Sequence, residues 1–467
     1  MGLKPSATFQ TRFGRIPDNV AINRGAGAMP RGASIRAKPG RGRPETPSPD
    51  GRPPTRRLQC QALIQPGFPM RTYRVLLMAL AMLGLTACGS LSRDVYTASD
   101  LAGPPPKGLA ELRFNASDSD AAVRFAEPAR KRAQAQRTFD VLALSGGGSN
   151  GAYGAGVLVG WTKRGERPEF DIVTGVSTGA LTAPFAFLGP SWDDRLAEAY
   201  TGKDAGKILR PRGLSVLFHT SFYSADGLRA VVDANVTDDL LQAIVAEHRR
   251  GRRLLIATTN LDTEETVIWD MGAIALRGDA ASRQLFKDVL VASASIPGVF
   301  PPALIEIQGP SRDLSEMHVD GGVTIPFFVA PESLLLWTAA KGQVRPGRLY
   351  VIVNGKVGGT FGFTKGKAGA IVGRSWDAMS KALMRTHLAA SSGFARRNGG
   401  QLFYAAIPNS TELDTSGLDF AVDNRSALFR MGYERAEAGW AWSLSDEPAE
   451  VPPGAPAVPA PPSIGGR

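Results

Sequence analysis

Three consecutive glycines interrupt the chain at residues 145–151 (SGGGSNG), directly after the apolar run 139–144 (FDVLAL). The apolar run is typical of a buried strand, and the residues that follow the loop, 152–161, show the periodicity of a helix. A strand, a glycine loop and a helix N-terminus in this order leave backbone N–H groups free to bind an anion. Glycine is needed where a side chain would stop the backbone from approaching its ligand.

Several interpretations of this loop are open. Gly146, Gly148 and Gly151 fit the spacing G-x-G-x-x-G of a dinucleotide-binding loop. A phosphate-binding P-loop does not fit, because Ala152 stands where the lysine would follow the last glycine. The same N–H donors could form an oxyanion hole for a developing negative oxygen. The remaining alternative is a turn that only allows a helix to pack closely on a strand.

A second strand–turn–helix pattern follows at residues 170–188. The apolar stretch 170–174 (FDIVT) leads into 175–179 (GVSTG), and an apolar helical run comes next. G-x-S-x-G in this setting is a nucleophile elbow, in which Gly175 and Gly179 allow a turn sharp enough to project the Ser177 hydroxyl. A dinucleotide-binding fold tends to end its second strand with an acidic residue, so this pattern favours the oxyanion hole.

A serine at its ordinary pKa needs an adjacent base to act as a nucleophile. The chain has four histidines, which are His219, His248, His318 and His387. In the order Ser…Asp…His only His387 follows Asp320, and it lies in a helix-like stretch that is more typical of a packing residue. Asp320 itself is followed by Gly321 and Gly322, which place its carboxylate on a turn that can approach another backbone closely. Asp-Gly is also a common hairpin signal, so the residues alone leave the base open.

Together, the blocks GGGSNG, GVSTG and VDGG resemble those of the patatin-like phospholipase family. The segments 254–270 and 292–302 are also similar to it, so the resemblance covers residues 139–355. It implies an α/β fold of three layers, with a central, mostly parallel sheet flanked by helices. It also implies a Ser–Asp dyad without histidine, in which Ser177 is the nucleophile and Asp320 its base. The backbone around Gly146, Gly147 and Gly148 would then form the oxyanion hole.

The chain departs from the family pattern at two places. After the DGG block it has Ile325-Pro326, where the family often has Asn-Pro. Asn150 stands where the family loop usually has arginine or lysine, so a cationic contribution to the oxyanion site is missing. The expected activity is hydrolysis of lipid carboxyl esters, as in a phospholipase A, a lysophospholipase or an esterase, with no cofactor and no metal. The alternative is a catalytically weak or silent envelope lipoprotein that acts as a binding module. Retention of all three blocks argues against this alternative.

A signal-peptide pattern lies at residues 70–87. Arg71 and Arg74 precede the apolar run 75–85, which is too short to span a bilayer as a helix. The run ends in Leu-Thr-Ala-Cys, which resembles the lipobox of bacterial lipoproteins and implies that Cys88 is lipidated. The expected location is therefore the bacterial cell envelope, with the protein anchored by lipid to the outer membrane.

The net charge of +11 arises entirely from the leader. Residues 1–87 hold 14 Lys or Arg and three Asp or Glu, which leaves 40 basic and 40 acidic residues after them. A formally neutral body excludes a basic nucleic-acid-binding domain. We expect translation to begin at Met70, with a genuine basic arm as the alternative. The expected organisation is 1–69 disordered extension, 70–87 signal peptide, 88–138 tether, 139–355 catalytic domain, 356–446 closing part of that domain or lid, and 447–467 Pro/Ala-rich tail.

Overall fold

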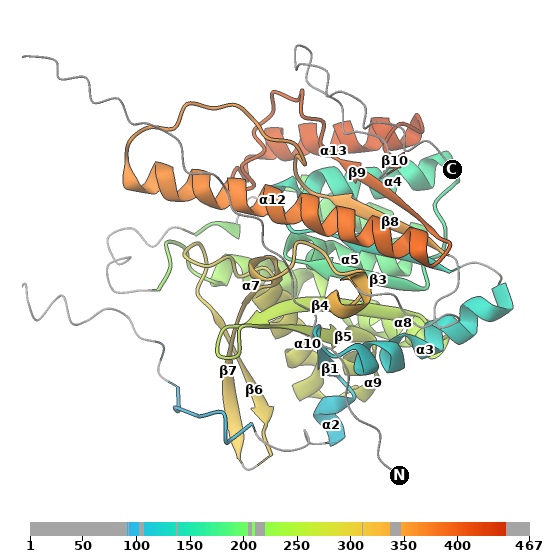
Figure 1. The fold of residues 1–467 in the computed structure, drawn as a ribbon, viewed down its shortest axis with the longest axis vertical. Coiled ribbons are helices and arrows are strands. Elements are labelled where there is room, and N and C mark those ends of the chain that lie inside the picture. Colours follow the sequence, from blue (N-terminus) through green and yellow to red (C-terminus); the bar gives the residue numbers. More distant parts are fainter. Residues whose placement is uncertain are drawn as a thin grey trace, which may run out of the picture. The chain divides into compact units, whose positions relative to one another are not determined.

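The computed structural model describes residues 91, 93–101, 107–136, 139–203, 208–210, 220–310, 312–336 and 347–444 (Figure 1). All of them belong to one unit of the chain, residues 70–467. The expected extension 1–69, the signal peptide 70–87, the candidate lipidation site Cys88 and the tail 447–467 lie outside the described residues.

A mixed sheet forms the centre of this unit. Its five central strands run parallel in the spatial order β4-β3-β2-β8-β9. These strands are β4 (Arg253–Asn260), β3 (Ile172–Val176), β2 (Asp140–Leu144), β8 (Arg348–Val353) and β9 (Gln401–Ala406). Antiparallel strands complete the sheet, namely β1 (Arg113–Asn115), β5 (Glu265–Asp270), β6 (Ala303–Gln308), β7 (Asp313–Asp320) and β10 (Ser443–Leu444). The expectation of an α/β fold with a central, mostly parallel sheet is confirmed.

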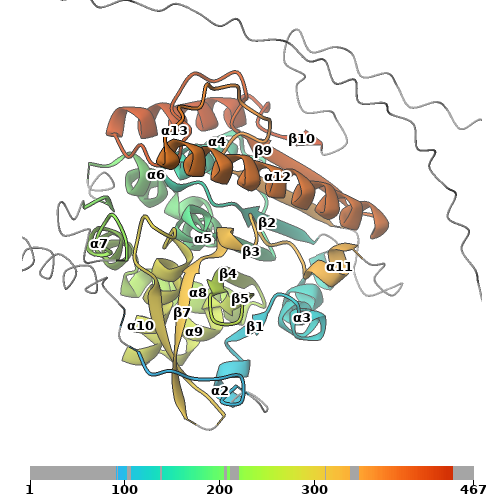
Figure 2. The ribbon, with the colours of Figure 1, turned by 60° about the vertical axis from the view of Figure 1, so that its left-hand side comes forward.

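Side chains of β2 alternate between two apolar cores, one on each face of the sheet. Leu142 and Leu144 join the first core, and Val141 and Ala143 join the second. The helices that bury residues in the first core are α4 (Gly151–Arg164), α5 (Thr178–Leu188), α6 (Asp193–Thr201), α7 (Asp226–Asn235), α8 (Asp238–Arg249), α9 (Met271–Arg277), α10 (Ala280–Ser293) and α13 (Val422–Glu437). The second core is covered by α3 (Ser119–Gln136), α11 (Glu332–Leu336) and α12 (Ala368–Arg397). Figures 1 and 2 show these helices on both sides of the sheet, which makes the three layers.

The expected tether at 88–138 is wrong for most of its described part. β1 pairs with β5, with Phe114 opposite Ile268, and α3 buries Ala122 and Ala129 against the sheet. The short helix α2 (Lys107–Ala110) precedes this strand. The three prolines at 104–106 and the polar stretch 115–120 are typical of a linker, and a strand of three residues is too short to show a pattern in the sequence. The pairing partner of β1 lies about 150 residues away, so no local signal marks it.

The region 356–446, expected as a closing part or a lid, is built into the body in its described part. β9 extends the parallel sheet beside β8, and α13 packs along α4. The backbones of α4 and α13 are in direct contact at Gly156. Only glycine fits there, because a Cβ would lie 2.0 Å from the carbonyl oxygen of Phe429. Among the described residues, no helix is long and apolar enough to cross a membrane.

Candidate active site

The turn between β3 and α5 has the shape expected of a nucleophile elbow. Ser177 stands between them with φ 55° and ψ −126°, a backbone conformation that is strained for any residue with a side chain. The flanking glycines make the turn possible: a Cβ at Gly175 would lie 2.6 Å from the carbonyl oxygen of Gly179, and one at Gly179 would lie 2.4 Å from that of Leu144. The chain therefore holds Ser177 at the carboxyl edge of the sheet, at the start of a helix.

A second strand brings Asp320 to this serine. β7 pairs antiparallel with the carboxyl end of β4, with Asp320 opposite Thr258, and β4 is the neighbour of β3. The Ser177 hydroxyl donates a hydrogen bond to Asp320 Oδ2 at 2.5 Å, and the Gly322 N–H donates to Asp320 Oδ1 at 2.7 Å. Gly321 allows the close turn, because a Cβ there would lie 2.6 Å from the carbonyl oxygen of Ala257.

Both members of this pair are buried, with exposed fractions of 4% for Ser177 and 5% for Asp320. Burial raises the pKa of Asp320 to about 7, although the hydrogen bonds from Ser177 and Gly322 act in the opposite direction. A carboxylate with a pKa near neutrality can accept a proton more readily than an ordinary aspartate, so the pair has the arrangement that general-base catalysis requires.

Two serines that sequence analysis did not single out hold the pair in place. The Ser177 N–H donates to Ser293 Oγ at 3.0 Å, and Ser293 Oγ donates to the carbonyl oxygen of Ala257 at 2.7 Å. The Asp320 N–H donates to the carbonyl oxygen of Ser295 at 3.0 Å. Both serines lie where α10 ends, within the segment 292–302 that resembles the family. The feature of the sequence that could have pointed to these serines is their position just before a proline-rich turn.

The three glycines of the loop are not equivalent. The Gly146 N–H already donates to the carbonyl oxygen of Pro326 at 3.3 Å. For the N–H groups of Gly147 and Gly148, the described part of the chain supplies no hydrogen-bond acceptor. The lack of a side chain at Gly146 instead lets the loop pack close to Ser177, since a Cβ at Gly146 would lie 3.1 Å from Ser177 Cβ. Gly147 and Gly148 therefore carry the donors that are free to bind an oxyanion.

Asn150 ties the glycine loop to the C-terminal region. Its Nδ2 donates to the carbonyl oxygen of Thr415 at 3.0 Å, and the neighbouring Ser149 N–H donates to that of Gly417 at 2.9 Å. A Cβ at Gly148 would lie 2.0 Å from the carbonyl oxygen of Gly417. The Asn150 side chain thus has a structural contact of its own, with a segment that sequence analysis did not connect to the site.

No described histidine is hydrogen-bonded to Ser177 or Asp320. Both ring nitrogens of buried His318 are engaged, Nδ1 with Thr258 Oγ1 and Nε2 with Glu316 Oε2. His387 lies on α12, edge-on to the Phe327 ring at 4.7 Å, and burial lowers its pKa to about 4. His219 lies outside the described residues. The geometry therefore favours a Ser–Asp pair over a triad through His387.

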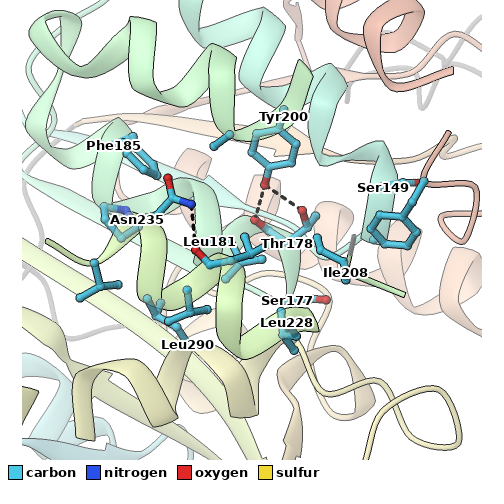
Figure 3. A pocket seen from close by; sticks show the side chains of 18 of the residues that line it. Ser149, Ser177, Thr178, Leu181, Phe185, Tyr200, Ile208, Leu228, Asn235 and Leu290 are labelled. Atoms are coloured by element: carbon cyan, nitrogen blue, oxygen red, sulfur yellow. Dashed lines mark hydrogen bonds between the residues drawn. The ribbon is translucent and has the colours of Figure 1, made fainter. Parts of the chain in front are cut away.

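An apolar cavity adjoins Ser177 (Figure 3). Its wall is almost entirely hydrocarbon and includes Leu181, Phe185, Leu228, Leu290 and Phe300. Polar groups in the wall are largely satisfied internally, as the Tyr200 hydroxyl is by Thr178 (Figure 3). Phe185 and Phe300 line this cavity, whereas Phe187, Phe327 and Phe328 do not. Among the described residues, no group of three His, Cys, Asp or Glu is placed to hold a metal ion.

Comparison with known proteins finds a domain of known type around this site. Residues 142–331 match the model of the patatin-like phospholipases. The chain contains a patatin-like phospholipase domain. Ser177, Asp320 and the glycine loop lie within this patatin-like domain, whereas β8, β9, α12 and α13 lie beyond its matched range.

Two further comparisons add little to this assignment. Among solved structures, the crystal structure of VipD from Legionella pneumophila is similar over 66% of this chain and 68% of that one. Its sequence identity of 13% and TM-score of 0.28 are too low to carry an argument. A search of curated proteins found no match.

Proposed function

We propose that this protein is a serine hydrolase that cleaves carboxyl esters of lipids through an acyl-enzyme. The observation that carries the proposal is the hydrogen bond of 2.5 Å between the Ser177 hydroxyl and buried Asp320, at the wall of an apolar cavity. The patatin-like domain supports the same reaction class. The substrate class follows from the cavity, which offers hydrocarbon contacts to an acyl chain and few free polar groups.

The reaction begins when Asp320 Oδ2 takes the proton from Ser177 Oγ as this oxygen attacks the ester carbonyl carbon. The N–H groups of Gly147 and Gly148 bind the oxyanion of the tetrahedral intermediate, each contributing about 3 kcal/mol. The C–O bond to the alcohol then breaks, and Asp320 returns its proton to the leaving alcohol. Water attacks the acyl-enzyme with Asp320 again as the base, and the fatty acid leaves as Ser177 regains its proton.

This mechanism predicts a dependence on pH that follows Asp320. The carboxylate is the active form, and burial raises the pKa of Asp320 to about 7. We therefore expect kcat/KM to fall about tenfold per pH unit below this pKa and to level off above it. The measurement is kcat/KM for a p-nitrophenyl acyl ester from about pH 5 to pH 9. An activity that stayed constant down to about pH 5 would contradict a base with a raised pKa at this position.

We also propose that Cys88 carries acyl chains and anchors the protein in the bacterial cell envelope, at the outer membrane. The proposal is supported by the order of charged start, apolar run and terminal cysteine in residues 70–88. Mass spectrometry of the protein from its native membrane is expected to give an N-terminal peptide that begins at Cys88 and carries lipid. An unmodified Cys88 inside a longer peptide would contradict it.

A further inference from the structure

Helix α12 is much longer than the part of the sheet that it covers. Its 30 residues span about 45 Å, whereas the six-residue strands β8 and β9 span about 20 Å. Met384 is the first buried residue of the helix, and Arg385 Nη1 donates to the carbonyl oxygen of Val357, just beyond the end of β8. Residues 368–383, called here the α12 overhang, therefore extend past the carboxyl edge of the sheet (Figures 1 and 2). Ser177 lies at this same edge.

The overhang has its polar side turned inward. Arg374 and Lys381 both bind Asp377, at 3.1 and 2.9 Å, and both donate to Thr360 in the loop that precedes the helix. These contacts hold the loop against the helix. An ordinary surface helix has the opposite arrangement, with its apolar side against the protein.

The outward side of the overhang is an apolar stripe. It consists of Val372, Trp376, Met379 and Leu383, which recur at helical spacing with exposed fractions of 68%, 47%, 67% and 36%. The loop adds two almost fully exposed rings, Phe361 at 102% and Phe363 at 89%. Large apolar side chains left exposed in this number on one helix and the loop before it mark an interaction site with another protein or with a membrane.

The charge around the stripe indicates the kind of partner. Residues 356–385 contain six Lys or Arg and a single acidic residue, Asp377. Lys365 and Lys367 are exposed and lie between the two phenylalanines and the helix. A helix with aromatic and aliphatic residues on one side, beside basic side chains, is the pattern of segments that lie in the interface of an anionic bilayer.

The start of the described chain lies at the same edge. The Arg93 guanidinium binds Asp262, with both contacts at 2.5 Å, and Asp262 follows the carboxyl end of β4, which is parallel to β3. Cys88 precedes Arg93 by five residues, which reach at most about 18 Å when extended. A lipid on Cys88 would therefore keep the bilayer near this edge.

We propose that the α12 overhang and Phe361 and Phe363 dock on an anionic lipid bilayer, so that the carboxyl edge of the sheet faces the membrane. The choice of a lipid surface rests on the proposed hydrolysis of lipid esters. The docking surface itself contains no residue of the catalytic pair, so binding can be measured without turnover.

The test is a fluorescence measurement at single positions of the full chain. The background carries Ser177→Ala to prevent hydrolysis, and Cys60→Ser and Cys88→Ser to remove the native thiols and any lipid on Cys88. Met379→Cys is labelled with an environment-sensitive fluorophore, and Trp440→Cys is the matched control. Trp440 is 71% exposed but follows α13 beside Arg164, at the opposite end of α4 from the glycine loop. The vesicles are pure phosphatidylcholine, or an equimolar mixture of phosphatidylcholine and phosphatidylglycerol.

We expect mixed vesicles to shift the emission at position 379 to the blue and increase it, with no change at position 440. The substitutions Lys365→Glu and Lys367→Glu are expected to raise the vesicle concentration for half-maximal change about tenfold or more. Equal changes at both positions, or none at position 379, would overturn the proposal. So would a shift at position 379 that needs no vesicles and grows with protein concentration, because a second copy of the chain would then cover the stripe. A chain that binds vesicles but hydrolyses no ester would overturn the proposed function alone.

Discussion

Replacing Ser177 by alanine is expected to lower kcat for a p-nitrophenyl acyl ester by about 10⁴-fold or more, because no acyl-enzyme can form. The hydroxyl removed is the donor of the 2.5 Å hydrogen bond to Asp320. The fold should tolerate the change, because alanine has to adopt the same backbone angles that serine already adopts. Steady-state kinetics on full-length protein, with the melting temperature measured in parallel, separates loss of the nucleophile from loss of structure.

A second buried hydroxyl provides the control for this variant. Ser149 lines the same cavity, and its Oγ has no hydrogen-bond partner among the described residues. Ser149→Ala is expected to retain activity within about tenfold, because its hydroxyl does not contact the carboxylate that serves as base. If Ser149→Ala proved severe and Ser177→Ala mild, the assignment of the nucleophile would be wrong.

Asp320→Asn is expected to reduce kcat about 10³- to 10⁴-fold, because an amide of the same shape cannot accept the serine proton.

The same substitution should also make the folded protein more stable above neutral pH. Burial raises the pKa of Asp320 to about 7 in the folded protein, above its pKa in the unfolded chain. The free energy of unfolding of the wild type therefore falls as the pH rises from the unfolded-state pKa to the folded-state pKa, because a charge must then be buried. Above that pKa the wild type retains the full cost of burying a charge, a few kcal/mol at most, and the asparagine variant does not.

Urea unfolding at about pH 6 and pH 9, together with kinetics, tests both effects at once. The stability gain of Asp320→Asn should be larger at the higher pH. His387→Ala is the control for the alternative triad and is expected to stay within about tenfold of the wild type, because His387 packs on Phe327. Severe loss in His387→Ala with a mild effect in Asp320→Asn would favour the triad instead.

The parts of the site that could be predicted are those with a local signal. The glycine loop, the turn around Ser177 and the turn after Asp320 each show a strand end and glycines within a few residues. What brings Asp320 to Ser177 is the pairing of β7 with β4, which joins residues about 60 positions apart. This neighbourhood could be predicted only through the resemblance to a family.

The features that were missed depend on distant contacts or on the direction of side chains. The strand β1 is too short to show a pattern, and its pairing with β5 decides its role. Phe327 and Phe185 are equally apolar in sequence, but they lie on opposite faces of the sheet. The apolar residues of the α12 overhang show the spacing of a buried helical face. Their exposure follows from a helix that is longer than the strands beneath it.

Labelling with a fluorophosphonate probe shows whether Ser177 is an activated nucleophile, because the probe reacts covalently with such a serine. We expect a single adduct on full-length folded protein, located by mass spectrometry in the peptide that contains Ser177. The adduct should be absent from Ser177→Ala and should form much more slowly in Asp320→Asn. Folded protein that gives no adduct, while a known serine hydrolase in the same tube reacts, would contradict the account and favour a silent binding module.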